Sequence, residues 1–136
     1  MRTVCDIRRL FLLSYFSSLS KLSFLLLGDS CQYWMDLEKQ TLSSPYYPQY
    51  YFADCEWLIT APEGHIISLE FVEDSYLHVT MFDGVCDETK KIETLYGSMP
   101  NDVKWIISSS GNYMFVRFDK DIISGTGFSA NVHYGK

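Results

Sequence analysis

The sequence has few basic residues and few histidines, and neither kind is clustered. Its 11 Lys and Arg are outnumbered by 17 Asp and Glu, which gives a net charge of −6. After residue 31, Lys90 and Lys91 are the adjacent basic residues, and no basic stripe forms. Because an acidic surface repels phosphate, we expect neither a nucleic acid nor an anionic membrane as a partner.

Residue patterns that carry metal or catalytic chemistry are also missing. None of the three histidines has a ligating residue at the spacing of a zinc site. The glycine-rich stretch 125–130 lacks the P-loop lysine, and Ser108–Gly111 lacks the Gly-x-Ser-x-Gly pattern of a nucleophile elbow. The sequence contains no Asn-x-Ser/Thr acceptor. No set of acid, base and nucleophile can be named, so we expect no enzyme.

No apolar run reaches the about 20 residues that a membrane span needs. Arg2, Arg8 and Arg9 precede an apolar stretch that Lys21 divides, and small residues stand at positions −3 and −1 of a cut before Cys31. This pattern predicts a cleaved secretory signal peptide at 1–30, with an uncleaved signal anchor as the alternative. Cleavage removes four of the 11 basic and two of the 17 acidic residues, which changes the net charge to −8. We expect no membrane span after cleavage.

The four cysteines divide unevenly at this cut. Cys5 lies in the predicted signal, and residues 31–136 keep Cys31, Cys55 and Cys86. Secretion permits disulfides. Three cysteines leave one thiol that is free, or is paired with another chain or with a missing domain.

Alternation of apolar and polar residues dominates the chain after residue 31, and no helix of convincing length is found. Short segments with period two are separated by turn residues, which is typical of an antiparallel sandwich or barrel. The inward faces are predicted to carry residues such as Trp57, Leu69 and Val116. Gly111 and Asn112 predict a hairpin turn. The predicted strands are CEWLITA, HIISLEF, YLHVTMFDG, KIETLYG, VKWIISSS, NYMFVRFD and GFSANVHY.

Six motifs in order make the sequence similar to one known family. They are SSPYYPQYYFADCEW, APEGHIISLEF, VTMFDG, LYGSMP, ISSSGNYMFVRFDKD and GFSANVHY. Together they cover residues 31 to 134 and resemble CUB domains. The resemblance implies an all-β fold, an antiparallel two-sheet β-sandwich of jelly-roll-like form at 31–136. It also implies an extracellular binding role without catalysis by the domain itself.

The resemblance further implies a disulfide between Cys31 and Cys55, with Trp57 in the core beside it. The second disulfide of many CUB domains is lost, since one of its positions is Tyr96 and the other falls in EDSYL. We expect the Tyr96 ring to fill the vacated volume. Cys86 matches neither family position, so it is predicted to be a free thiol or an intermolecular bridge.

Many CUB domains bind calcium, and the resemblance places candidate ligands here. Glu73 or Asp74 and then Asp121 match ligand positions, and Tyr47 matches a supporting tyrosine. Two further oxygen-bearing positions of the family are Leu77 and Ile123 in this chain. A calcium ion needs six to eight oxygen ligands. We therefore expect no intact calcium site and no cofactor, with Glu73 and Asp121 as the residual candidates.

These observations predict a secreted, non-catalytic binding module. Its partner is expected to be an extracellular protein or a glycan, held by loops at one end of the sandwich. One alternative is a fragment of a larger extracellular protease or receptor. Another is a structural protein that is covalently linked through Cys86. The predicted contact loops are 72–76, 84–90 and 119–126, and the predicted binding residues are Tyr47, Tyr50, Tyr51, Glu73, Asp74 and Asp121.

Overall fold

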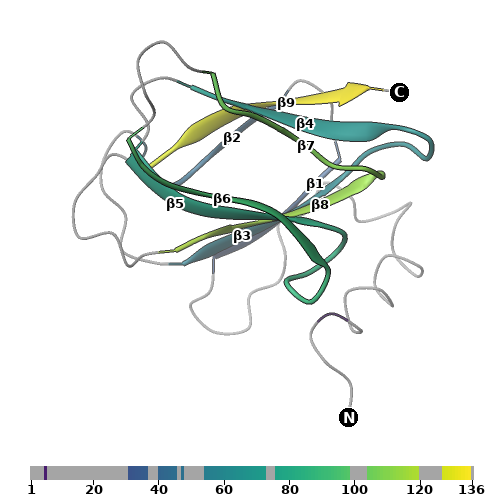
Figure 1. The fold of residues 1–136 in the computed structure, drawn as a ribbon, viewed down its shortest axis with the longest axis horizontal. Coiled ribbons are helices and arrows are strands. Elements are labelled where there is room, and N and C mark those ends of the chain that lie inside the picture. The colour runs from purple at the N-terminus through teal and green to yellow at the C-terminus, as the bar shows by residue number, and fades with distance from the viewer. Residues whose placement is uncertain are drawn as a thin grey trace.

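The structure is a computed structural model in which the described part of the chain is built from β-strands (Figure 1). It describes residues 5, 31–36, 40–45, 47, 54–72, 76–98, 104–119 and 127–135. Within these ranges, no helix has the length and apolar character needed to cross a membrane. The strands are β1 (Cys31–Met35), β2 (Thr41–Ser43), β3 (Cys55–Thr60), β4 (Ile66–Phe71), β5 (Tyr76–Asp83), β6 (Lys90–Ser98), β7 (Ile106–Ser108), β8 (Tyr113–Phe118) and β9 (Ser129–Gly135).

The strands form two sheets that lie one above the other (Figure 1). One sheet has five strands in the order β1-β3-β8-β5-β6, and the other has four strands in the order β2-β9-β4-β7. The pairings are antiparallel except for that of β1 with β3, which is parallel. The prediction of an all-β, two-sheet sandwich is therefore confirmed.

The core lies between the two sheets and contains the alternate residues that the sequence pattern predicts. Trp57, Leu69 and Val116 are each at most 3% exposed and belong to one buried cluster. Phe128 lies in the middle of this cluster, with its ring 5.4 Å from Trp57 and 5.6 Å from Phe118. Replacing a buried aromatic ring of this kind with Ala costs about 3–5 kcal/mol, so these contacts hold the two sheets together.

The turn at Gly111 and Asn112 does not join two strands of one sheet, which makes the hairpin prediction wrong. β7 pairs with β4 in the four-stranded sheet, whereas β8 pairs with β3 and β5 in the five-stranded sheet. The chain crosses from one sheet to the other between these two strands. Local sequence permits a tight turn here, but long-range strand pairing determines which sheet each strand joins.

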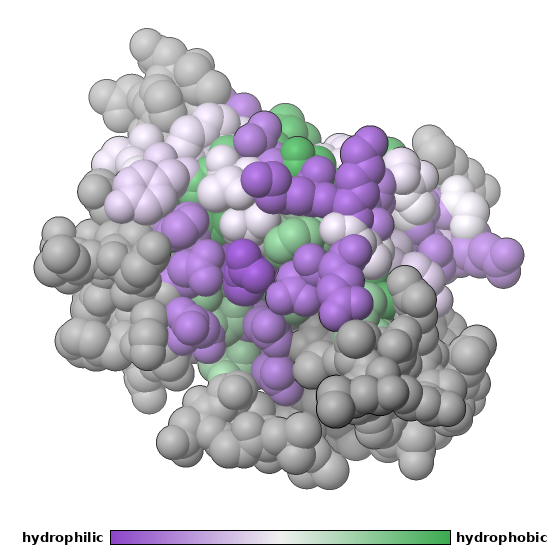
Figure 2. Space-filling view, turned by 60° about the horizontal axis from the view of Figure 1, so that its bottom comes forward, coloured by the Kyte–Doolittle hydropathy of each residue, from purple (hydrophilic) through white to green (hydrophobic). Residues whose placement is uncertain are grey.

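The outer face of the five-stranded sheet carries a row of apolar side chains. Trp34, Leu58, Phe115 and Phe82 lie opposite one another in register across β1, β3, β8 and β5, and each is at most 7% exposed. We call these four residues the outer row. Viewed from this side, hydrophilic side chains spread over the face, and hydrophobic ones are visible between them (Figure 2). The five-stranded sheet thus has buried apolar residues on its outer side too, unlike the usual water-facing side of an antiparallel sheet.

Candidate recognition site

Segments that are far apart in the sequence approach one another at one end of the sandwich. Cys55 lies opposite Phe118 in register, so the residues that flank this pair, Asp54 and Asp119, are at the same end. The backbone N–H of Val72 donates to the carbonyl of Ser129 at 2.8 Å, which joins the end of β4 to the start of β9. We define the loop end by its described residues Tyr47, Asp54, Val72, Asp119 and Gly127.

A disulfide anchors this end of the sandwich. Cys31 is bonded to Cys55 across the first residues of β1 and β3, as the family resemblance implies. Trp57 is 3% exposed in the same buried cluster, so its predicted place beside the bridge is confirmed. Tyr33 covers one face of the indole, with the two rings stacked at 5.9 Å. The strand that leads away from the loop end is thus fixed by a covalent bond and by ring contacts.

The entry to β9 is held by a close contact between two distant turns. The N–H of Phe128 donates to the Ser44 hydroxyl at 3.0 Å, and the N–H of Ser44 donates to the Phe128 carbonyl at 3.0 Å. Gly127 has a φ of +77°, in the left-handed region. A Cβ atom at Gly127 would collide with the Ser44 hydroxyl. Glycine is therefore required both for its conformation and for this approach.

The predicted site residues are only partly within the described chain. Tyr47 is half-buried, and its N–H donates to the Ser44 carbonyl at 3.1 Å in the Ser-Pro turn. Tyr50, Tyr51, Glu73, Asp74 and Asp121 lie outside the described residues. Val72 and Asp119 place the flanks of two predicted contact loops, 72–76 and 119–126, at the loop end.

The third predicted contact loop lies elsewhere. Residues 84–89 follow Asp83, which pairs with Lys90 at the far end of β5 from its first residue. The Ser110 N–H donates to Asp83 at 3.0 Å, so this loop neighbours the crossing from β7 to β8. The prediction that 84–90 acts together with 72–76 and 119–126 at one end is wrong, because β5 runs the length of the sandwich between them.

The positions of Leu77 and Tyr96 bear on two expectations from the sequence. The first concerns the calcium site, and the second concerns the filling of the core. Leu77, at a family position for a calcium ligand, is fully buried in the core between the sheets. Tyr96 is 63% exposed and touches the His78 ring at 4.9 Å, so the expectation that it fills core volume is wrong. Among the residues that the structure describes, no three His, Cys, Asp or Glu side chains are placed to hold a metal ion.

Sequence reasoning did not single out a line of charged groups on the outer face beside the loop end. The Arg117 guanidinium lies 3.4 Å from the Asp87 carboxylate and 3.5 Å from that of Asp119. Asp119 also lies 3.7 Å from the His78 imidazole, and Arg117 sits over the Phe82 ring at 5.4 Å. No residue spacing in the sequence predicts this line of charged groups, because their contacts depend on the register between β5 and β8.

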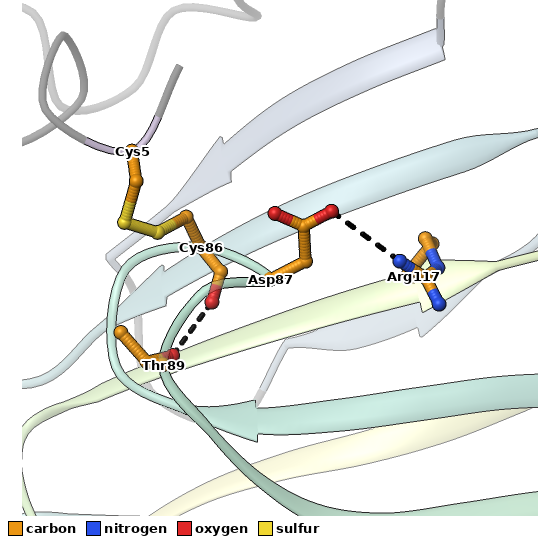
Figure 3. The surroundings of a disulfide bond; sticks show 5 residues. All are labelled: Cys5, Cys86, Asp87, Thr89 and Arg117. Carbon is orange, nitrogen blue, oxygen red and sulfur yellow. Dashed lines mark hydrogen bonds and ion pairs between the residues drawn. A yellow bond between two sulfur atoms is a disulfide. The ribbon is translucent and has the colours of Figure 1, made fainter. Parts of the chain in front are cut away.

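The prediction of a free or intermolecular Cys86 applies to a chain without residues 1–30, and the structure of the whole chain does not test it. Cys86 is bonded to Cys5, and every cysteine is paired (Figure 3). The two residues are 1% and 2% exposed, and they lie in a small cluster with Trp34, Leu58 and Val85. The predicted signal peptide includes Cys5, so its removal leaves Cys86 without a partner inside the chain.

Comparison with known sequences identifies the class of this domain. A profile of the CUB domain family matches residues 31–132, and the chain belongs to that family. CUB domains are in general protein-binding modules of larger extracellular proteins, and catalysis by such proteins resides in other domains. The family expected from the sequence motifs is confirmed.

Individual relatives match over the same domain. Cubilin of Canis lupus familiaris is 35% identical over 102 residues, which are 68% of this chain and 3% of that protein. Tolloid-like protein 1 of Mus musculus is 33% identical over 100 residues, which are 65% of this chain and 10% of the relative. The full extracellular region of zebrafish Gpr126/Adgrg6 aligns with a TM-score of 0.62 and 26% identity, covering 78% of this chain and 15% of that one. The chain thus spans a small part of each relative.

Proposed function

We propose that this chain is a secreted, non-catalytic recognition module that binds an extracellular protein or a glycan through its loop end. Residues 1–30 serve as the signal peptide in this proposal. The observation that carries it is the meeting of Asp54, Val72 and Asp119 at one end of a two-sheet frame. Three segments that are distant in sequence, 46–53, 73–75 and 120–126, begin or end there. Loops on a rigid β-scaffold are a common place for recognition residues.

The charge of the chain narrows the class of partner. Without residues 1–30 the net charge is −8, and Asp54 and Asp119 add carboxylates to the described part of the loop end. Complementary potentials speed association, and like charges oppose it. We therefore favour a neutral or basic surface, such as a basic protein patch or an uncharged glycan, over a sulfated or sialylated one.

Binding at the loop end is tested with the secreted chain on an array of extracellular protein domains and on a glycan array. Each ligand found is then measured against Tyr47→Ala and Asp54→Ala, and against Glu63→Ala as a matched control in the exposed turn between β3 and β4. The loop-end variants are expected to weaken binding at least tenfold, and the control is expected to leave it unchanged. Ligands that lose affinity only with Glu63→Ala would place recognition at the opposite end and overturn the proposal.

A second possibility is that the module acts within a longer protein. The chain covers 3% of dog cubilin and 10% of mouse Tolloid-like protein 1, so in these relatives the matching domain is a small part of a much longer chain. Full-length transcript sequencing tests this: a continuous reading frame into a further domain supports it. A stop codon directly after Lys136 in every transcript contradicts it.

A further inference from the structure

The outer row is buried although it lies on the face that points away from the core. Trp34 and Leu58 are 7% and 3% exposed, and they share a cluster with Val85 and the Cys5–Cys86 bridge. This cluster is separate from the one that fills the space between the sheets. An apolar group of this size on an outer sheet face is typical of a covered surface rather than of one in contact with water.

Cys86 is held at this surface by a tight turn. The Thr89 hydroxyl donates to the Cys86 carbonyl at 2.6 Å, and the Thr89 N–H donates to the same oxygen at 3.2 Å. A Cβ atom on Gly84 would come within 2.5 Å of the Thr89 side chain, which shows how closely the turn folds on itself. Asp87, next in the chain, is paired with Arg117 of β8 (Figure 3). The sulfur of Cys86 is thus presented from a fixed position beside Trp34 and Leu58.

Signal cleavage and the Cys5–Cys86 bridge exclude each other. A cut before Cys31 removes Cys5, while Cys31 and Cys55 remain bonded to one another. The same cut therefore leaves Cys86 with a thiol and removes Cys5 from the cluster of Trp34, Leu58 and Val85. In the intact chain the Cys5 side chain occupies the space beside Cys86. This space therefore has room for the side chain of a second cysteine.

We propose that, after cleavage, this surface binds a second copy of the chain through a Cys86–Cys86 disulfide and contact between the Trp34, Leu58 and Val85 side chains that Cys5 no longer covers. The proposal rests on the secretion proposed above. Each processed copy carries the same unpaired cysteine in the same patch, which suits a two-fold interface in which identical surfaces meet. Asp87 and Arg117 flank the cysteine with opposite charges, so across a two-fold axis the carboxylate of one copy is able to face the guanidinium of the other.

Bond formation requires an oxidant, and the secretory pathway supplies disulfide compounds of that class. Two Cys86 thiols lose two protons and two electrons and become one S–S bond. The electrons reduce one oxidised glutathione to two glutathione thiols by successive thiol–disulfide exchanges. Two acidic chains repel each other, which opposes association without a bond. The covalent bond is therefore essential for the dimer.

The test uses the full chain expressed in a secretory cell line and recovered from the medium. Mass analysis is expected to show a chain that begins at Cys31, and a species of twice its mass that reduction converts to monomer. Peptide mapping without reduction is expected to recover a Cys86–Cys86 linked peptide. Cys86→Ser is expected to be monomeric with an unchanged melting temperature. A monomer whose Cys86 reacts with iodoacetamide, or a retained N-terminal segment bonded as Cys5–Cys86, overturns the proposal.

Charge variants separate a specific interface from random thiol oxidation. Asp87→Lys places like charges across the two-fold axis and is expected to slow dimer formation by oxidised glutathione at least fivefold. The double variant Asp87→Lys/Arg117→Glu is expected to restore the rate. Glu70→Lys makes the same charge change on the other sheet and is expected to have no effect. Equal rates for Asp87→Lys and Glu70→Lys overturn the docking surface. Loop-end binding by monomeric Cys86→Ser tests the proposed function separately.

Discussion

Gly127 shows how a single residue fixes the approach of two distant turns. Its φ of +77° is one that L-residues other than glycine rarely adopt. The Ser44 hydroxyl occupies the space where a side chain would begin, and it also accepts the N–H of Phe128. The residue therefore has two separate constraints, one on backbone conformation and one on space.

We predict that Gly127→Ala destabilises the fold by about 2 kcal/mol or more, because backbone strain and the collision with Ser44 add together. Gly64→Ala is the matched control. Gly64 has a similar φ of +86° but nothing within 4 Å of the added methyl group, so its cost is expected to be about 1 kcal/mol. Urea unfolding of both variants measures the difference. Equal losses would mean that the space beside Ser44 adjusts freely.

The side chain of Ser109 forms hydrogen bonds with backbone groups, in place of a backbone partner. Its hydroxyl accepts the Ile67 N–H at 2.9 Å and donates to the Gly111 carbonyl at 2.7 Å, and Ser109 itself is 5% exposed. It lies where the chain leaves β7 for the other sheet. A buried N–H that loses its acceptor carries the full penalty of desolvation.

We predict that Ser109→Ala lowers the free energy of unfolding by about 1–3 kcal/mol. Ser108→Ala changes a neighbouring hydroxyl that is exposed and bonds only to Ser68 among the described contacts, so a loss below about 0.5 kcal/mol is expected. Thermal unfolding followed by circular dichroism compares the two. A Ser109→Ala protein as stable as Ser108→Ala would show that water replaces the lost hydroxyl.

At the scale of strands, the sequence pattern predicted which segments are extended and which faces are buried. Period-two alternation placed Trp57, Leu69 and Val116 inward, and all three are in the core. The alternation succeeds because each of these strands has one face toward the other sheet, and that face must be apolar. It also contained an unused signal, since Leu58 and Phe115 are apolar at outward positions and belong to the outer row.

Strand pairing was less accessible to sequence reasoning. The local pattern at Gly111 and Asn112 predicts a hairpin where the chain crosses between sheets, and no pattern predicts the short strands β1 and β2. Their partners lie 24 or more residues away in the chain, so no local pattern specifies them. The same holds for the candidate site. Tyr47 was placed by its motif, whereas the contacts of Asp119 with Arg117 and His78 depend on register alone.

The parallel edge strand β1 leads to a prediction about its covalent anchor. Cys31 and Cys55 close a loop with a sequence separation of 24. In the chain-entropy model, closing such a loop stabilises the fold by about 3–4 kcal/mol. We predict that Cys31→Ala/Cys55→Ala loses roughly this amount in denaturant unfolding. Gln32→Ala removes only the 3.0 Å hydrogen bond to Glu56 on the same strand pair and is expected to lose less than about 1 kcal/mol. Similar losses in both variants would show that packing, not the bridge, holds β1.

For the whole molecule, the length of β5 separates the two proposed activities. The loop end lies at one end of β5, and Cys86 follows the other end of the same strand. Binding at the loop end therefore leaves the surroundings of Cys86 available to a second copy in the proposed dimer, and a two-fold dimer would present two loop ends. Avidity from two sites raises apparent affinity for a partner that displays repeated ligands, provided that both sites are reached at once.

Calcium gives the last prediction at this scale. A ligand that binds only the folded state stabilises it by RT ln(1 + [L]/Kd). Extracellular calcium modules have Kd values of about 10⁻⁴–10⁻³ M, so 10 mM calcium would add about 1.4–2.7 kcal/mol and raise the Tm of a domain this size by several degrees. We expect a shift below about 1 °C, equal to that with 10 mM magnesium, because buried Leu77 offers no oxygen where the family has a ligand. A rise of several degrees with calcium alone, abolished by Asp121→Ala, would show that the remaining carboxylates complete a site without it.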